Sequence, residues 1–299
     1  MLFTEWLFSG RFCGVPGPRR RPTVAAGPAL LLSCKRMRTE FPIKVGMVRW
    51  ISGCGLLLAG SVALAGVQPP ATLLHITTEY SPPTSMQEGD VVVGSATDKV
   101  REAMTRAGVP YTLEMLPWKR AYTAALSRPD VCVYSTTRTP ERERLFKWVG
   151  PTDEGDWVLL GRADRNYRLT TLEDARSLRI GTYNGDARDE YLRSRGFNVD
   201  PAPNDMINPQ KLMMNRIDLW AAGFRRGSAV MEANGWAGKI VPVLTFKRVR
   251  LYLACNPAVP DATIDRLNAS LEAMGKDGTT RRLDRKYEGH VSAKPPPQQ

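Results

Sequence analysis

The residue types that carry most metal and catalytic chemistry are few in this sequence and stand far apart. The only histidines are His75 and His290, and the only cysteines after residue 65 are Cys132 and Cys255. None of the four has a further cysteine or histidine at ligand spacing, so we expect no metal site. The sequence also lacks a nucleophile beside a base and a phosphate-binding loop. We therefore expect no cofactor and no catalytic residue.

One polar turn has the composition of an anion-binding loop. Residues 183–187 read Tyr-Asn-Gly-Asp-Ala and lie between a β-prone run and a helical pattern. Exposed amides at the start of a helix can bind an anionic group. Asp186 could instead serve only as a helix cap, because short acidic side chains are common there.

The net charge of +12 is concentrated at the start of the chain. Residues 1–65 hold nine of the 42 basic and two of the 30 acidic residues, which leaves 33 basic and 28 acidic residues in the remainder. A surface of mixed sign is the ordinary solvated kind, and the interleaved basic and aromatic stripe of a nucleic-acid-binding surface is absent. We expect no nucleic-acid partner.

Residues 47–65 have the parts of a secretory signal peptide. A cationic start (MVRW) precedes an apolar run of about 15 residues, and Ala63-Leu64-Ala65 suits cleavage after Ala65. A membrane-spanning helix needs about 20 apolar residues. We therefore expect export across the inner membrane to the periplasm. Residues 1–46 are interpreted as an extension from a start codon placed too far upstream of Met47.

Strand-like and helical patterns alternate from residue 73 onward, then pause at a polar stretch and begin again. The predicted strands are 73–78, 111–116, 130–135, 157–160, 180–182, 217–221 and 250–255. The predicted helices are 98–107, from Pro117, from Thr139, 188–195, 210–215, 262–274 and 279–287. Such alternation favours an α/β fold with largely parallel sheets in two lobes, and residues 291–299 are expected to be disordered.

Seven short motifs occur in a fixed order along the chain. They are EYSPP (79–83), PW (117–118), DVCVYSTTRTPER (130–142), WVGP (148–151), LRIGTYNGDA (178–187), RIDLW (216–220) and LYLACNP (251–257). In this combination the sequence resembles the polar-amino-acid family (family 3) of periplasmic solute-binding proteins over about residues 70–290.

The resemblance implies an α/β, two-lobed, periplasmic-binding-protein-like (type II) clamp with two hinge crossovers. Lobe 1 would comprise residues 70–158 and 248–290, and lobe 2 residues 159–247. The strand at 250–255 would return to lobe 1 beside the strand at 130–135. Cys132 and Cys255 would then lie on neighbouring strands, either as a disulfide or as two buried thiols.

The resemblance also implies that the ligand is held in the cleft between the lobes, with several contacts from the first lobe. Tyr80 and Trp118 would hold the ligand between aromatic faces, although Trp118 could simply pack the lobe. Arg142 would grip a ligand carboxylate, assisted by Ser135 and Thr137 and by Thr139. The alternative is that Arg142 belongs to a solvated Glu-Arg-Glu-Arg helix face.

In the second lobe, Tyr183, Asp186 and Ala187 would contribute the polar turn. The aspartate that holds the ligand's amino group in the family falls near Gly223 here, so that anchor is missing. Glu79 or Asp218 could supply the negative charge instead. We therefore expect a small polar ligand that bears a carboxylate, either an amino acid or an organic acid.

These expectations favour a monomeric binding protein that delivers its ligand to an inner-membrane ABC permease. Two alternatives stay open. One is a dehydratase-like enzyme on the same fold, with Glu79 as proton donor and Arg142 as carboxylate holder. The other is a stand-alone sensory binding module.

Overall fold

The computed structural model describes residues 73–288, which belong to one compact unit of the chain. The predicted signal peptide, the extension before it and the predicted disordered tail lie outside these residues. No helix within residues 73–288 is long and apolar enough to cross a membrane.

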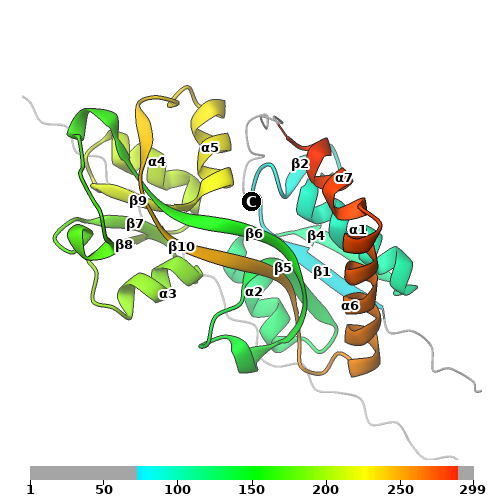
Figure 1. Ribbon diagram of the computed structural model, residues 1–299. Helices are drawn as coiled ribbons and strands as arrows, with labels where there is room; N and C mark the ends of the chain where they lie inside the picture. Colours follow the sequence, from blue (N-terminus) through cyan, green and yellow to red (C-terminus); the bar gives the residue numbers. More distant parts are fainter. Residues whose placement is uncertain (1–72, 289–299) are drawn as a thin grey trace, which may run out of the picture. The chain divides into compact units, whose positions relative to one another are not determined.

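A single eight-stranded sheet organises the described chain, with two long strands at its centre (Figure 1). The strand order is β4-β1-β5-β10-β6-β9-β7-β8. The strands at one end are β1 (Leu74–Thr78), β4 (Tyr111–Met115) and β5 (Val131–Thr137), and those at the other end are β7 (Ile180–Tyr183), β8 (Val199–Ala202) and β9 (Leu219–Gly223). The central strands are β6 (Lys147–Arg162) and β10 (Ile240–Cys255). A separate hairpin joins β2 (Met86–Glu88) to β3 (Val91–Val93).

We call the part built on β1, β4 and β5 lobe 1, and the part built on β7, β8 and β9 lobe 2. Within each lobe these strands pair in parallel, whereas β10 is antiparallel to β5 and β6, and β6 is antiparallel to β9. The chain passes between the lobes once along β6 and returns along β10, which makes this pair antiparallel. The expected parallel pairing thus holds inside each lobe and not where the lobes join.

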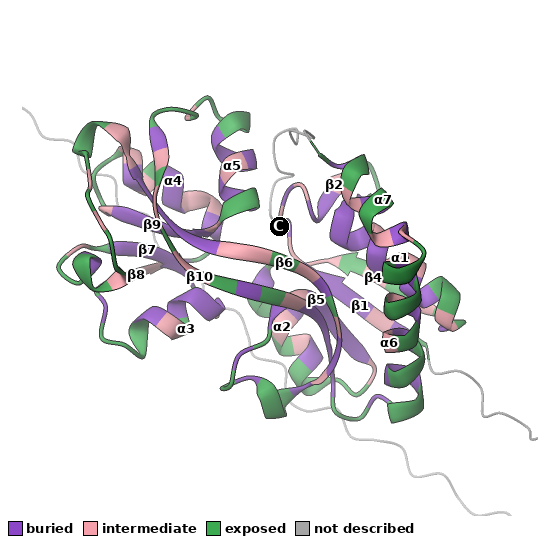
Figure 2. Cartoon of the chain, in the orientation of Figure 1, coloured by how far each residue is buried: buried purple, intermediate pink, exposed green. Residues whose placement is uncertain are grey.

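Helices cover both faces of each lobe's part of the sheet. Lobe 1 carries α1 (Ser95–Ala107), α2 (Trp118–Ser127), α6 (Asp261–Lys276) and α7 (Thr279–Lys286), and lobe 2 carries α3 (Ala187–Arg193), α4 (Asn208–Met213) and α5 (Phe224–Ala233). In α1 the buried residues Ala96, Val100, Ala103 and Met104 recur at helical spacing, so one stripe faces the core. Figure 2 shows the resulting contrast between the largely buried strands β1, β5, β7 and β9 and the half-exposed helices.

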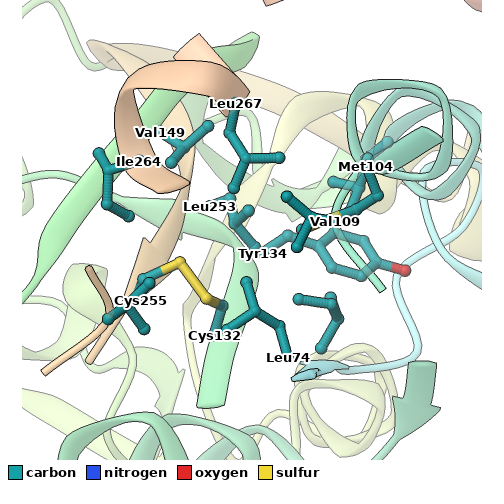
Figure 3. Packing of buried hydrophobic residues seen from close by; sticks show 14 residues of the cluster. Leu74, Met104, Val109, Cys132, Tyr134, Val149, Leu253, Cys255, Ile264 and Leu267 are labelled. Carbon is teal, nitrogen blue, oxygen red and sulfur yellow. A yellow bond between two sulfur atoms is a disulfide. The ribbon is translucent and has the colours of Figure 1, made fainter. Parts of the chain in front are cut away.

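The core of lobe 1 lies between the sheet and helices α1 and α6, and Figure 3 shows its packing. Cys132 of β5 is the register partner of Cys255 of β10, and a disulfide joins their sulfur atoms. Leu74, Leu253 and Leu267, all at most 2% exposed, belong to the same cluster. The bond therefore ties the returning strand to the first lobe inside an apolar core.

The predicted helix from Thr139 is wrong. Only one 3-10 turn, Glu143–Leu145, lies between β5 and β6. Because β6 begins at Lys147, the connection has no room for a longer helix after the turn at residues 140–142.

Candidate functional site

A cavity of about 100 Å³ lies between residues of the two lobes, beside the central strands. Its lining includes residues at or just after the carboxyl ends of β1, β5, β7 and β9. In α/β sheets these ends form the usual ligand-binding edge, because the loops that follow parallel strands gather there. Eight of the nine predicted ligand residues line this one cavity: Glu79, Trp118, Ser135, Thr137, Arg142, Tyr183, Asp186 and Ala187.

Arg142 is buried in this cavity wall, with 1% of its surface exposed. Its Nε donates to Glu190 at 3.0 Å, and its Nη2 donates to the carbonyl oxygen of Gly185 at 3.1 Å. The guanidinium also lies 4.7 Å from the ring centre of Tyr122. Its Nη1 is buried and has no hydrogen-bond partner among the described residues. The solvated helix face considered for Arg142 is therefore excluded.

Ser135 presents a second unpaired polar atom to the cavity. Its Oγ is buried without a hydrogen-bond partner in the described chain. Its backbone has φ of 58°, a left-handed conformation that costs a non-glycine residue free energy. Such strain is typical of positions that orient a side chain or amide for binding. Together, Arg142 Nη1 and Ser135 Oγ offer donors to an anionic group.

Glu79 and Tyr183 meet across the cavity from different lobes. The Tyr183 hydroxyl donates to Glu79 Oε1 at 2.8 Å, and Arg226 donates to Glu79 Oε1 at 2.8 Å and to Oε2 at 3.4 Å. Burial raises the pKa of Glu79, and the charge and hydrogen bonds of Arg226 offset only part of that rise. Arg226 keeps a second carboxylate, Asp205, at 3.7 Å, so it stays compensated if Glu79 is protonated.

Asp186 is the N-cap of α3, and both of its carboxylate oxygens accept hydrogen bonds from Arg188. Its Oδ1 accepts from the backbone amide of Arg188 at 2.9 Å and from Arg188 Nε at 2.6 Å, while its Oδ2 accepts from Nη2 at 3.1 Å. Burial opposes ionisation of Asp186, but the charge and hydrogen bonds of Arg188 outweigh it and lower the pKa. Because Asp186 takes this amide, the amide is not free to bind an anion, and the capping interpretation of this turn is the one observed.

Trp118 begins α2 and connects the two lobes. Its Nε1 donates to the carbonyl oxygen of Gly185 in lobe 2 at 2.8 Å. The predicted second aromatic face, Tyr80, does not line the cavity. It is 7% exposed and packs with Met86 and Tyr287. Successive side chains of an extended segment point in opposite directions, so Tyr80 turns away where Glu79 turns inward.

The cavity residues that were not predicted include Asp153 and Trp157 of β6, Arg188 of α3 and Arg226 of α5. Arg188 follows the polar turn, and Arg226 follows the end of β9, so a signal for both was their place after a parallel strand. Gly223 also lines the cavity, and a Cβ placed there would lie 3.7 Å from Arg188 Nη1. The guanidinium of Arg188 therefore lies beside Gly223.

Three solved structures illustrate the likeness of the fold. A histidine kinase sensor domain with similarity to periplasmic binding proteins has 17% identity and a TM-score of 0.68, covering 73% of this chain and 97% of that one. A mutant of ArgBP from T. maritima has 18% identity and a TM-score of 0.65, covering 73% and 96%. An ancestral arginine-binding protein bound to arginine has 21% identity and a TM-score of 0.64, covering 72% and 98%. Comparison with curated protein sequences gave no match.

Two α/β lobes, two crossing strands and a polar cavity between the lobes define a periplasmic-binding-protein-like clamp. The model of the bacterial extracellular solute-binding proteins, family 3, matches residues 74–290, and the chain belongs to that family. The resemblance drawn from the sequence motifs is thereby confirmed.

Proposed function

We propose that this protein captures a small polar ligand bearing a carboxylate, an amino acid or a related acid, outside the inner membrane and delivers it to an ABC permease. The observation that carries the proposal is the pair of unsatisfied donors in the cavity, Arg142 Nη1 and Ser135 Oγ. Buried polar groups are normally hydrogen-bonded, and a guanidinium fork matches a carboxylate. The family supports an extracytoplasmic location.

Binding by closure of two lobes explains why the site residues come from both. Hydrogen bonds join the two lobes at three residues of lobe 1. Glu79 bonds to Tyr183 and Arg226 of lobe 2. Trp118 bonds to Gly185, and Arg142 bonds to Gly185 and Glu190. A hinge about β6 and β10 would open these contacts and admit a ligand. Glu79, Ser135, Thr137, Tyr183, Asp186 and Ala187 would then contact it together with Trp118 and Arg142. A monomer presenting both lobes to a permease fits this mechanism.

A thermal-shift screen of the purified protein against the amino acids and small organic acids tests the proposal. A ligand at 100 times its dissociation constant adds about 2.7 kcal/mol to the free energy of unfolding. We expect stabilisation by at least one carboxylate-bearing compound and none by its amide or ester. A folded protein that no carboxylate stabilises would refute the proposed ligand class.

A sensory binding module is the second candidate function, because a histidine kinase sensor domain shares the fold over 73% of this chain. Uptake of the radiolabelled ligand separates the two. Deletion of the gene should abolish high-affinity uptake if the protein serves a permease. It should leave uptake intact, and abolish a transcriptional response to the ligand, if the protein is a sensor.

A further inference from the structure

The carboxylates that line the cavity differ in whether they have an oxygen left to bind a ligand. Glu79 accepts hydrogen bonds at both oxygens, from Tyr183 and Arg226. Asp186 accepts at both oxygens from Arg188. The negative charge of each is therefore already compensated by a buried arginine, which leaves less of it to offset the charge of a ligand ammonium.

Asp153 of β6 is different. Its side chain is 8% exposed, and its protein partners gather at Oδ1. Oδ1 accepts from the amide of Glu154 at 2.8 Å and from Arg225, and it lies 3.9 Å from Lys99 Nζ. Oδ2 is buried and has no hydrogen-bond partner within residues 73–288. Lys99 has its own closer counter-charge, Asp284, at 2.6 Å.

The direction of the Asp153 side chain follows from the register of the central strands. Asp153 pairs with Leu251 and Gly155 pairs with Val249, and all four residues line the cavity. Side chains at alternate positions of a strand share a face. The intervening Glu154 is exposed and contacts Arg248, whose side chain is 78% exposed. Asp156 also lines the cavity and is the register partner of Arg248, but neither of its oxygens is a buried atom without a partner among the described residues.

We propose that Asp153 Oδ2 accepts hydrogen bonds from the α-ammonium group of an amino-acid ligand whose carboxylate binds Arg142. This inference rests on the proposed function and narrows its ligand class to zwitterions. The charged group nearest to Gly223 is the guanidinium of Arg188, whereas Asp153 combines a negative charge with an unsatisfied acceptor. A buried acceptor without a partner is costly, so a donor from the ligand gains the full value of the bond.

Isothermal titration with matched pairs of compounds tests the role of Asp153. The pairs are L-glutamate with glutarate, L-glutamine with 4-carbamoylbutanoate, and L-arginine with 5-guanidinopentanoate. The second compound of each pair lacks only the α-amino group of the first. The remaining amino acids are screened alongside these pairs. Asp153→Asn should weaken amino-acid binding about 10- to 100-fold. The same change should leave binding of the des-amino acid within about threefold, since only the ammonium contact is lost.

Glu154→Gln is the matched control, because Glu154 is an acid on the same strand that is exposed and outside the cavity. It should leave binding of both members of a pair unchanged. Asp153→Glu keeps the negative charge but moves the carboxylate. It should keep the preference for the amino acid over its des-amino partner. This variant replaces Asp153→Asn in the test if the asparagine variant does not fold.

Equal losses for both members of a pair in Asp153→Asn would make Asp153 a structural residue and overturn the inference. Unchanged amino-acid binding would do the same. Wild-type protein that binds organic acids and no amino acid would also overturn it, while leaving the proposed function intact. Protein that binds neither class would refute the proposed function itself.

Discussion

At the scale of single residues, the site consists of buried arginines held by carboxylates that differ in solvent exposure. Arg142 is 1% exposed, but its partner Glu190 has a side chain that is 45% exposed. A buried charge needs close compensation, and a half-exposed carboxylate supplies it only in part. A ligand carboxylate at Nη1 would complete it.

Replacing Arg142 with alanine should therefore weaken carboxylate binding by roughly 2–4 kcal/mol, roughly 30- to 1000-fold. Isothermal titration against a compound from the thermal-shift screen measures it. Arg138→Ala is the control, because Arg138 is a neighbouring arginine paired with Glu143 outside the cavity. Undiminished affinity in Arg142→Ala would remove Arg142 from the site.

Asp186→Asn should lower the free energy of unfolding by about 3 kcal/mol at pH 7, because it leaves Arg188 without its bidentate carboxylate. The pKa of Asp186 is lowered in the folded protein from 3.8. Its stabilisation is therefore complete above pH 3.8 and is lost as pH falls through the lower folded value. Urea unfolding of both proteins at several pH values should show the difference shrinking below pH 3.8. A difference that stays constant there would contradict this.

The position of Arg142 and Ser135 at the cavity could be predicted from the sequence, because a motif names both residues. Tyr80 was wrong because the motif fixes the loop and not the direction of each side chain within it. The sequence patterns do not predict helix α5, so they give no sign that Arg226 on that helix lines the cavity. Arg225, which lies 72 residues away in the chain, bonds to Oδ1 of Asp153 and leaves Oδ2 unpaired within the described residues. No local sequence pattern could reveal a contact over that separation.

At the scale of elements, strongly periodic segments such as α1 and α6 were predictable, whereas α5 was not. Helix α5 contains Gly227, where a Cβ would lie 2.8 Å from Leu160 Cδ1. Glycine weakens the helical signal, but close packing against β6 requires it. The helix therefore depends on tertiary contacts that propensity does not report.

The disulfide between Cys132 of β5 and Cys255 of β10 leads to a prediction about stability. The two residues are 123 positions apart, and closing so long a loop restricts the unfolded chain. We expect the intact protein to weigh two daltons less than the reduced form. Reduction should lower the free energy of unfolding by about 4–5 kcal/mol. The double variant Cys132→Ser, Cys255→Ser should match the reduced protein in urea, and an unreduced mass without the deficit would show that the thiols are free.

At the scale of the whole described unit, ligand binding and proton uptake should be linked through Glu79. Closing the lobes buries Glu79, and burial raises its pKa above the ordinary 4.5. The closed form therefore holds the proton more tightly than an open form that leaves Glu79 in water. Closure is favoured below the raised pKa, and this advantage is lost as pH rises through it.

The affinity for a ligand that does not titrate between pH 5 and 8 should accordingly increase as pH falls, by at most about tenfold per pH unit. Glu79→Gln should bind with little dependence on pH. Titrations in buffers of different ionisation enthalpy would detect the proton taken up by the wild type. A flat profile in the wild type would show that Glu79 has the same pKa in both forms.

The indole of Trp118 gives this protein a built-in optical signal. Its N–H bonds to the Gly185 carbonyl of the other lobe, and its ring borders the cavity. When the clamp opens, the indole N–H would bond to water instead of the Gly185 carbonyl. A bound solute would lie against the indole ring. The fluorescence emission of Trp118 should therefore change when the site fills. The unmodified protein could then report solute concentration in a spectrometer without a dye or label, and its opening and closing rates could be followed in a stopped-flow instrument.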